Sequence, residues 1–196
     1  MKIKSTHITY TPPTITLSER NIKNNHNSGI VFFSGYNGPI NTIFLLELEA
    51  TLFKIGLQAM IINNSIMRNR LCSDLRESPK NLNENFRRAI ELSKLISNAG
   101  WIVLADLISF NLSGQNIEPE FQMSDLHEIE LSSNSRRNTL HIFTKVQKDC
   151  HQKIPAIYKN AVATFLSINI DSPDRSLIIK IISQHIKEIF NQKDKL

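Results

Sequence analysis

The sequence predicts an α/β protein, a three-layer α/β/α sandwich with a mainly parallel sheet. Short apolar segments, each long enough for one strand, alternate along the chain with longer segments whose apolar residues have helical spacing. One short segment, Trp101–Leu104, is apolar at every position, which is typical of a strand buried on both faces of a parallel sheet. Strands joined by helical crossovers lie parallel, with helices covering both faces of the sheet.

The predicted elements follow one another in a regular order. The strands are predicted at residues 30–34, 57–63, 101–104, 139–144 and 165–170. The helices are predicted at residues 18–23, 42–55, 79–99 and 175–190. The charged segment Ser65–Glu77 is predicted to be a loop, and the polar segment 115–137 is predicted to be helical in part.

Local signals mark the ends of these helices. Ser18 is expected to cap the first helix, because a serine hydroxyl accepts a hydrogen bond from an N–H group of the first turn. Ser78 followed by Pro79 gives the same signal for the third helix, since proline suits the first helical position. Gly56 and Gly100 are expected just after the second and third helices, where φ is often positive.

Length and composition predict one globular domain at residues 29–196, with residues 1–28 as an N-terminal extension that packs on the core. The sequence has no signal-peptide pattern and no apolar run of about 18 residues, so we expect a soluble, cytoplasmic protein without membrane contact. Cys72 and Cys150 lie far apart and the six histidines have no i,i+4 pairing, so no metal site is predicted.

The charge of the chain favours an anionic ligand. The formal net charge of +5 suits a nucleotide or a sulfate ester. Lysine and arginine are spread along the chain, and no motif combines them with aromatic residues as nucleic-acid-binding domains do. Nucleic acid is therefore not the expected partner.

The turn after the first predicted strand is an incomplete phosphate-binding loop. The pattern G-x-x-x-x-G-K-[ST] combines glycines, a lysine and a hydroxyl residue to hold phosphates and Mg²⁺. Here only the first glycine and the final threonine match, while isoleucine and asparagine replace the second glycine and the lysine. The predicted nucleotide-binding residues are Gly35, Tyr36, Asn37, Gly38, Pro39, Ile40, Asn41 and Thr42.

Several ordered motifs resemble those of the adenylylsulfate kinases, from about residue 8 to residue 190. They include Ser73-Asp-Leu75, Glu84-Asn-Phe-Arg-Arg88, Ala99-Gly-Trp-Ile-Val-Leu104, Leu107-Ile-Ser109, Tyr158-Lys159 and Ile170-Asp-Ser-Pro173. Enzymes of this family phosphorylate the 3′-hydroxyl of adenylyl sulfate (APS) with ATP, which gives PAPS and ADP. The resemblance therefore implies a P-loop NTPase-like fold and a role in sulfate activation.

The resemblance also implies ligands and partners. Arg68, Asn85, Ile108 and Ser109 match positions that the family uses around the adenylyl group and its phosphosulfate. ATP and Mg²⁺ are the expected cofactors of the family, and APS is its substrate. Dimers are common in the family, so a homodimer or a complex with other sulfate-activation enzymes is a possible assembly.

The departures from the family concern phosphate handling. Asn41 replaces the lysine of the phosphate-binding loop, and Pro39 removes one N–H donor from it. The family's D-G-D-N-V-R motif reads Asn63-Asn-Ser-Ile-Met-Arg68 here, so both aspartates, at the positions of Asn63 and Ser65, are absent. Since phosphoryl transfer depends on such charges and on Mg²⁺, no catalytic residue is assigned and binding of ATP and Mg²⁺ is placed in question.

Three interpretations remain open. The first is a catalytically impaired pseudokinase with a binding or regulatory role, which binds ATP or APS weakly. The second is an active adenylylsulfate kinase with a remodelled site that uses Thr42, Asp106 and Arg68. The third is a non-enzymatic module for an anion or partner, whose basic residues are Arg68, Arg70, Arg87 and Arg88. Against the third, Arg87 and Arg88 have the helical spacing to pair with Glu84.

Overall fold

The computed structural model describes residues 11–36, 39–76, 78–110, 139–145, 164–169 and 174–191. The predicted helical segment 115–137, Asn37, Gly38 and Cys150 lie outside these residues. None of the helices in the described part of the chain combines the length and the apolar content that a membrane crossing requires.

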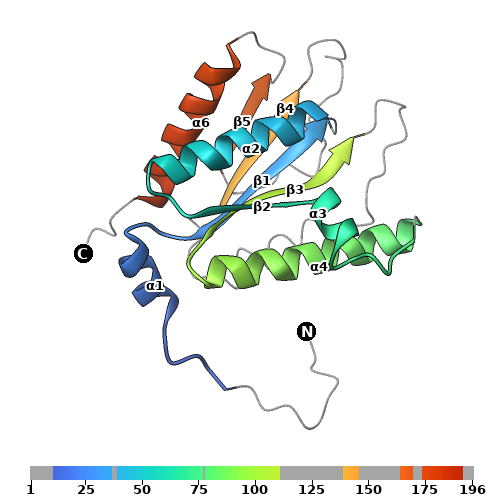
Figure 1. The fold of residues 1–196 in the computed structure, drawn as a ribbon, viewed down its shortest axis with the longest axis horizontal. Helices are drawn as coiled ribbons and strands as arrows, with labels where there is room; N and C mark the ends of the chain where they lie inside the picture. Colours follow the sequence, from blue (N-terminus) through green and yellow to red (C-terminus); the bar gives the residue numbers. More distant parts are fainter. Residues whose placement is uncertain are drawn as a thin grey trace.

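Five parallel strands form one sheet in the order β2-β3-β1-β4-β5 (Figure 1). Their bounds are β1 Gly29–Tyr36, β2 Ala59–Asn63, β3 Ile102–Phe110, β4 Thr139–Lys145 and β5 Thr164–Asn169. The prediction of a parallel sheet is confirmed. Because β1 lies in the middle, the chain first builds the sheet on one side of it and then on the other.

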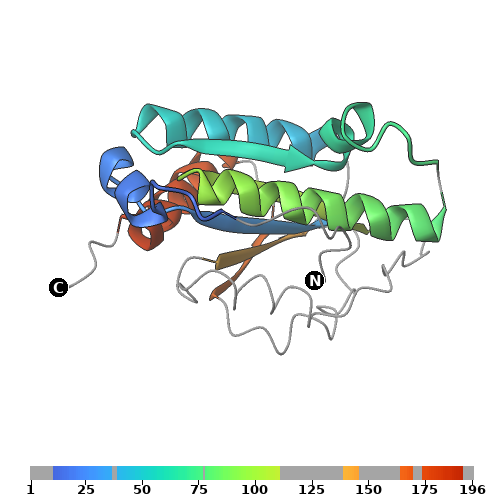
Figure 2. The ribbon, with the colours of Figure 1, turned by 90° about the horizontal axis from the view of Figure 1, so that it is seen from below.

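Helices cover both faces of the sheet (Figure 2). Helices α2 (Pro39–Lys54) and α6 (Arg175–Phe190) pack on one face, with side chains such as Leu48 and Ile182 fully buried against it. Helices α3 (Asn64–Asn69) and α4 (Pro79–Asn98) pack on the other face. Apolar burial on both faces of the central strands stabilises this arrangement, as the sequence predicts for a three-layer sandwich.

Two of the predicted boundaries at α2 shift in the structure for clear reasons. Helix α2 begins at Pro39, three residues before the predicted start, because proline has a suitable φ and lacks an N–H that the first turn would leave unpaired. Strand β2 begins at Ala59 because Leu57 still takes part in the turn that follows α2, where its N–H donates to the carbonyl oxygen of Leu52.

The loop predicted at residues 65–77 is wrong in its first part, and the cap of the first helix is also wrong. Helix α3 occupies Asn64–Asn69, since Asn63 supplies an N-cap that the sequence reading overlooked. Helix α1 (Leu17–Asn24) is capped by Thr16 rather than Ser18. The Thr16 hydroxyl accepts from the N–H of Glu19, whose carboxylate in turn accepts from the N–H of Thr16.

Both predicted helix-ending glycines are confirmed. Gly56 after α2 has φ +85° and Gly100 after α4 has φ +96°, a region that side-chain-bearing residues rarely adopt. At Gly100 the chain turns back, so that the N–H of Trp101 donates to the carbonyl oxygen of Ile96. The same pattern at Gly56 returns the chain to the sheet.

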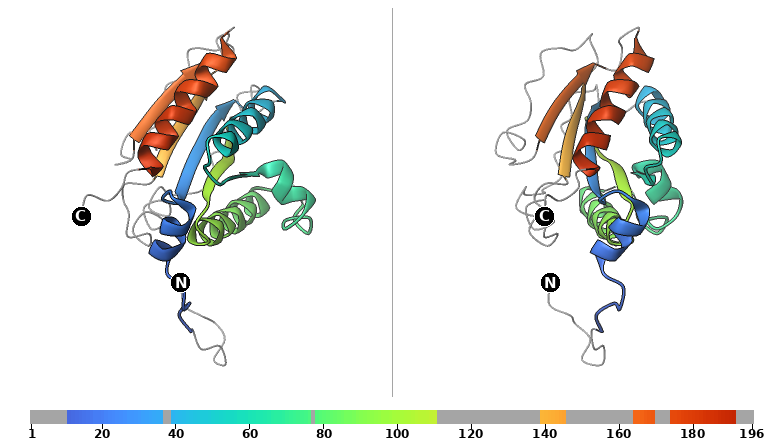
Figure 3. Two further views of the ribbon diagram at one scale, coloured as in Figure 1. Left: turned by 60° about the vertical axis from the view of Figure 1, so that its left-hand side comes forward. Right: turned by 90° about the vertical axis from the view of Figure 1, so that its left-hand side faces the viewer.

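Helix α1 lies beside the C-terminal end of α4 (Figure 3). The end of α1 and the residues that follow it form hydrogen bonds with three other parts of the molecule. The Asn24 side chain donates to the carbonyl oxygen of Gly100 at 2.8 Å. The Gln58 N–H donates to Nε2 of buried His26 at 3.1 Å, so the His26 Nδ1–H donates to the carbonyl oxygen of Asn27. The Asn27 N–H donates to the carbonyl oxygen of Phe190 at the end of α6. The division of the chain at residue 28 remains a prediction.

Candidate functional site

The candidate site lies at the carboxyl ends of β1, β3 and β2. In a parallel sheet, ligands bind beyond these ends, near the point where the strand order reverses, and here that point is β1. The predicted phosphate-binding loop leaves β1 at Tyr36 and enters α2 at Pro39. Thr42, in the first turns of α2, is exposed. N–H groups at the start of a helix lack helical partners and attract anions.

Strand β3 carries an irregularity beside this loop. Phe33 of β1 pairs with Asp106 of β3, but the next residue, Ser34, pairs with Ile108, so one residue of β3 is left over. The predicted substrate residues Ile108 and Ser109 therefore run beside Ser34 and Gly35. The fold brings this end of β3 next to the phosphate-binding loop, as the motif resemblance implies.

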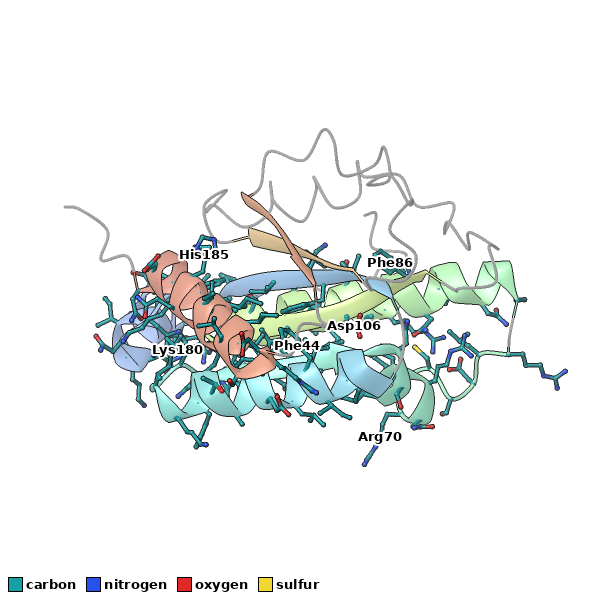
Figure 4. All side chains as sticks on the ribbon, turned by 90° about the horizontal axis from the view of Figure 1, so that it is seen from above. Phe44, Arg70, Phe86, Asp106, Lys180 and His185 are labelled. Carbon is teal, nitrogen blue, oxygen red and sulfur yellow. The ribbon has the colours of Figure 1, made fainter. Side chains whose placement is uncertain are left out.

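Asp106 is a nearly buried carboxylic acid at this edge, with 7% of its surface exposed. Its register partners are Phe33 on β1 and Asn63 on β2. Residues two apart on a strand share a face, so Asp106 lies on the same side of β3 as Leu104, which packs under α2. Figure 4 shows Asp106 on the α2 side of the strands, opposite Phe86 of α4.

Asn63 has a structural task in this arrangement. Its side-chain Oδ1 accepts a hydrogen bond of 2.8 Å from the N–H of Ile66 and thereby caps α3. Only 8% of Asn63 is exposed. The resemblance puts a family aspartate at this position, and asparagine and aspartate cap helices about equally well. The fold therefore keeps the cap and loses the negative charge.

Asn85 of α4 is buried beside the start of α3, with 4% exposure. Its Nδ2 lies 3.5 Å from Oδ1 of Asn64, at the outer limit of a hydrogen bond. Its Oδ1 is buried and has no hydrogen-bond partner among the described residues. An unpaired buried acceptor costs about 1–3 kcal/mol, so this position favours a bound donor group.

The segment after α3 is held to α4 by Arg88. Its guanidinium donates to both carboxylate oxygens of Asp74, at 2.6 and 2.9 Å, and to the carbonyl oxygen of Leu71 at 2.9 Å. It also donates to Glu84 at 2.9 Å, one turn earlier on α4. We call Arg88 with these three partners the Arg88 clamp. Bidentate arginine–carboxylate pairs fix geometry well, so the clamp orients the 71–74 segment.

Glu84 pairs with two arginines, as its helical spacing predicts. Arg87 donates twice to it at 2.7 Å, and Arg88 once. These hydrogen bonds, first from Arg87 and then from Arg88, lower the pKa of Glu84 to about 2. The hydrogen bonds from Arg88 lower the pKa of Asp74 as well. Two of the four arginines of the predicted basic surface are thus engaged with carboxylates.

The other predicted residues are distributed around this edge. Arg68 lies on α3 and is exposed, and Arg70, which follows α3, is exposed too (Figure 4). Cys72 is buried below the Arg88 clamp, and burial is the main cause that raises the pKa of its thiol. Within the described ranges, no group of three or more histidine, cysteine or acidic side chains is arranged to hold a metal ion.

Sequence reasoning missed two features of this site. The first is the cap of α3, although an asparagine before an apolar helical segment is a known start signal and Asn63 precedes Ile66 and Met67. The second is the bidentate contact of Arg88 with Asp74, which are 14 residues apart in the sequence and belong to no local pattern. The first was readable from the sequence and the second was not.

Comparison with known proteins identifies the family. The family model described as "Adenylylsulphate kinase" matches residues 27–134, which is more than half of the chain. The chain belongs to the adenylylsulfate kinase family. The matched range contains the phosphate-binding loop, α3, α4 and β3, so it includes the described part of the candidate site.

Curated relatives agree with the family match. An adenylyl-sulfate kinase of Staphylococcus carnosus is 36% identical over 107 residues, which cover 55% of this chain and 54% of that protein. A probable adenylyl-sulfate kinase of Halalkalibacterium halodurans is 36% identical over 102 residues, covering 52% of this chain and 49% of that protein. The match thus spans about half the length of these relatives.

Solved structures of adenylylsulfate kinases share the fold. The enzyme of Mycobacterium tuberculosis, solved in complex with AMPPNP and APS, has a TM-score of 0.54 and 20% identity. The aligned part covers 83% of this chain and 97% of that one. A hexameric enzyme of Thiobacillus denitrificans has a TM-score of 0.59 and 16% identity, covering 90% of this chain and 32% of that one. The P-loop NTPase-like fold class is thereby confirmed.

Proposed function

We propose that this chain is a binding or regulatory member of the adenylylsulfate kinase family with impaired phosphoryl transfer. It would bind APS, or the adenylyl part of a nucleotide, without using it efficiently as a phosphoryl acceptor. The observation that carries the proposal is the structural role of Asn63 as the N-cap of α3. Its side-chain oxygen caps α3 and carries no charge, at the position where the resemblance puts a family aspartate.

The phosphate-binding loop supports the proposal. The resemblance puts the family lysine at Asn41, the third residue of α2, and an asparagine can donate to a phosphate but brings no positive charge to it. A hydrogen bond to a charged group contributes about 1.5–3 kcal/mol, so we expect the replacement of this lysine to weaken ATP binding by roughly tenfold or more. Pro39 supplies no N–H at the start of α2, which removes one further donor from the loop.

The residues at this edge fit Mg²⁺ poorly. Mg²⁺ prefers oxygen ligands and is usually bound through one or two carboxylates together with substrate phosphates. Thr42 offers an exposed hydroxyl and Asp106 a carboxylate, whereas the oxygen of Asn63 is already bonded to Ile66. Among the described residues this edge keeps one carboxylate, that of Asp106, and the loop lysine is replaced, so we expect a metal–nucleotide complex to be held weakly here.

The adenylyl side is better equipped. The buried Oδ1 of Asn85 has no partner in the described part of the chain and can accept from a donor such as an adenine amino group. The Arg88 clamp orients the segment that follows α3, next to Arg68 and the start of α4. A positioned acceptor and an oriented loop are what a binding site requires, and they do not depend on the missing charges.

One observation favours a second candidate, an active kinase with a remodelled site. Asp106 is buried on the α2 side of the sheet, on the strand next to Asn63. A carboxylate there is one strand away from the position of the missing family aspartate. The anion-binding module of the third interpretation is less well supported, because Arg87 and Arg88 are paired with Glu84 and Asp74.

The test combines binding with turnover. The purified chain is incubated with ATP, Mg²⁺ and APS, and PAPS and ADP are separated by chromatography, beside Asn41→Lys and Asp106→Asn variants. In parallel, APS binding is measured calorimetrically for the wild type and for Asn85→Ala. We expect no PAPS from the wild type, and APS binding that Asn85→Ala weakens.

The other possible results separate the interpretations. PAPS from the wild type that Asp106→Asn abolishes would establish the remodelled kinase instead. Absence of APS binding in a folded wild-type chain would refute the proposed binding role. Product from Asn41→Lys but not from the wild type would show that the missing loop lysine is the main cause of the impaired transfer. Capture of sulfate-activation enzymes by the immobilised wild-type chain would identify a regulatory partner.

A further inference from the structure

The segment between α3 and α4, Arg70–Arg76, is fastened to α4 by side chains of that helix (Figure 1). We call this segment the strap. It consists mainly of turns, in which the N–H of Ser73 donates to the carbonyl oxygen of Arg70 and the N–H of Leu75 to that of Cys72. Most of its residues are exposed, and only Cys72 and Leu75 reach the apolar layer under α4.

Two side chains of α4 hold the strap at separate points. Arg88 donates to the carbonyl oxygen of Leu71 at 2.9 Å and to both carboxylate oxygens of Asp74 at 2.6 and 2.9 Å. Asn81 Nδ2 donates to the carbonyl oxygen of Arg76 at 2.9 Å. Because Asn81 and Arg88 are about two helical turns apart, the strap is fixed to α4 at both ends of a short stretch of that helix.

Asn85 lies between these two points of attachment. It follows Asn81 by four residues and precedes Arg88 by three, so the three side chains share one face of α4. Its Oδ1 is buried and has no hydrogen-bond partner among the described residues, while its Nδ2 lies 3.5 Å from Oδ1 of Asn64. A donor group of a ligand can reach a buried oxygen only after a neighbouring segment moves.

The second half of the strap is suited to such a movement. Its first half is anchored, because Cys72 is buried and its N–H donates to the carbonyl oxygen of Met67 at 2.8 Å. Within residues 73–76 only Leu75 packs against the core, and the Asp74 side chain is 59% exposed. Segments with few buried contacts open at a small cost in free energy. Residues 73–76 can therefore swing away from α4 about the anchor at Cys72.

We propose that the strap is a lid over Asn85 and that Arg88 is the positioning residue that sets its closed state; the inference rests on the adenylyl-binding role proposed above. Opening admits a ligand whose amino group donates to Asn85 Oδ1, and closure retains it. Arg88 acts through Asp74 and does not touch the ligand. Its bond to Glu84, at 2.9 Å, keeps the guanidinium in place on α4 while the strap is open, so the contact with Asp74 forms again at the same point.

The test is the rate and affinity of APS binding to the purified full chain and to Asp74→Asn. This substitution removes the charge that Arg88 holds and leaves the bond between Arg88 and Glu84 in place. A lid that opens more readily should admit APS faster and release it faster still, so we expect the dissociation constant to rise roughly tenfold. Thermal stability should change little, because exposed ion pairs contribute little to folding. A purely structural contact would not speed association.

Two further variants separate the lid from a general effect of charge. Asp74→Glu keeps a carboxylate for Arg88 and should restore part of the affinity that Asp74→Asn loses. Glu91→Gln is the matched control, since it makes the same change of acid to amide on α4, where Glu91 pairs with Lys94. It should leave both rates unchanged. In addition, saturating APS should slow hydrogen exchange of the strap amides in the wild type.

The possible failures of the lid and of the binding role differ in their results. APS binding that Asp74→Asn leaves unchanged, or strap amides whose exchange APS does not slow, would overturn the lid and leave the binding role intact. Slower association in Asp74→Asn would mean that the clamp only orients a site that is already open, and would also overturn the lid. If the folded wild type binds no APS, the binding role and the lid are both refuted. Circular dichroism verifies that each variant is folded.

Discussion

Gly100 and Gly56 allow a controlled measurement of how the N-terminal segment is attached. Both glycines end a helix with positive φ, +96° and +85°. A Cβ at Gly56 would meet nothing within 4 Å, so Gly56→Ala measures the backbone strain alone. A Cβ at Gly100 would lie 2.7 Å from Nδ2 of Asn24 and 3.1 Å from Cβ of Arg20. Gly100→Ala therefore adds a clash to the same strain.

The magnitudes follow from these contacts. Placing a side chain at positive φ costs about 1–2 kcal/mol, which applies to both substitutions. The clash at Gly100 also displaces Asn24, whose side chain donates to the Gly100 carbonyl at 2.8 Å, and losing that bond costs roughly 1 kcal/mol. We expect Gly100→Ala to lower the free energy of unfolding by about 2–3 kcal/mol. For a domain of this size each kcal/mol lowers Tm by about 2–4 °C.

Thermal and urea unfolding of both variants checks the prediction, and a double mutant isolates the clash. In an Asn24→Ala background the contact with Nδ2 is absent and only the 3.1 Å contact with Cβ of Arg20 remains. Gly100→Ala should therefore cost less there than in the wild type, with a loss closer to that of Gly56→Ala. Equal losses for Gly100→Ala and Gly56→Ala in the wild-type background would refute the reasoning. That result would mean that the Asn24 contact contributes nothing to the attachment of the N-terminal segment.

Three further predictions concern single side chains. Glu84→Gln should lower stability at neutral pH by roughly 1 kcal/mol: the fall of its pKa from 4.5 to about 2 corresponds to about 3 kcal/mol, which solvent screening reduces because Glu84 is 33% exposed. Since the pKa is lowered by folding, this contribution is present above pH 4.5 and is lost as the pH falls through about 2, so urea titrations should show a flatter acid limb in the variant. Leu48→Ala should lower the free energy of unfolding by about 2–5 kcal/mol because Leu48 is fully buried. Leu46→Ala should change it by less than about 0.5 kcal/mol because Leu46 is 53% exposed. Equal losses would contradict the assignment of one face of α2 to the core and the other to the surface. Asn63→Ala should cost about 1 kcal/mol through loss of the α3 cap, while Asn63→Asp should leave thermal stability nearly unchanged, and a large loss in Asn63→Asp would show that the amide is needed for more than the cap.

The layers of the fold were predictable from the sequence because they depend on local patterns. Continuous apolar runs such as Trp101–Leu104 predict buried strands, and Gly56 and Gly100 mark the ends of α2 and α4. The shifted boundaries have local causes as well: Pro39 begins α2 because proline suits the first helical position, and Asn63 begins α3 by capping it. Both signals lie in the sequence, but tertiary packing decides which of several capping residues is used.

The site was predictable only in part, because its geometry depends on residues far apart in the chain. The family motifs indicate Arg68 and Asn85, yet only the structure reveals that Oδ1 of Asn85 is buried without a partner among the described residues. The contact of Arg88 with Asp74 and the burial of Asp106 next to β2 arise from the packing of separate elements. The loop residues Asn37 and Gly38 remain sequence predictions.

The cap of α3 explains how this fold tolerates a change in its chemistry. The oxygen that accepts the Ile66 N–H is present in both aspartate and asparagine, so folding responds weakly to the exchange at Asn63. Phosphoryl transfer, in contrast, depends on negative charge that holds Mg²⁺ and on positive charge that meets phosphate. A position whose structural task needs only an oxygen can therefore lose its charge without losing the fold. For this reason the sheet, both core layers and the caps persist around a site whose charges differ from those that the family motif implies.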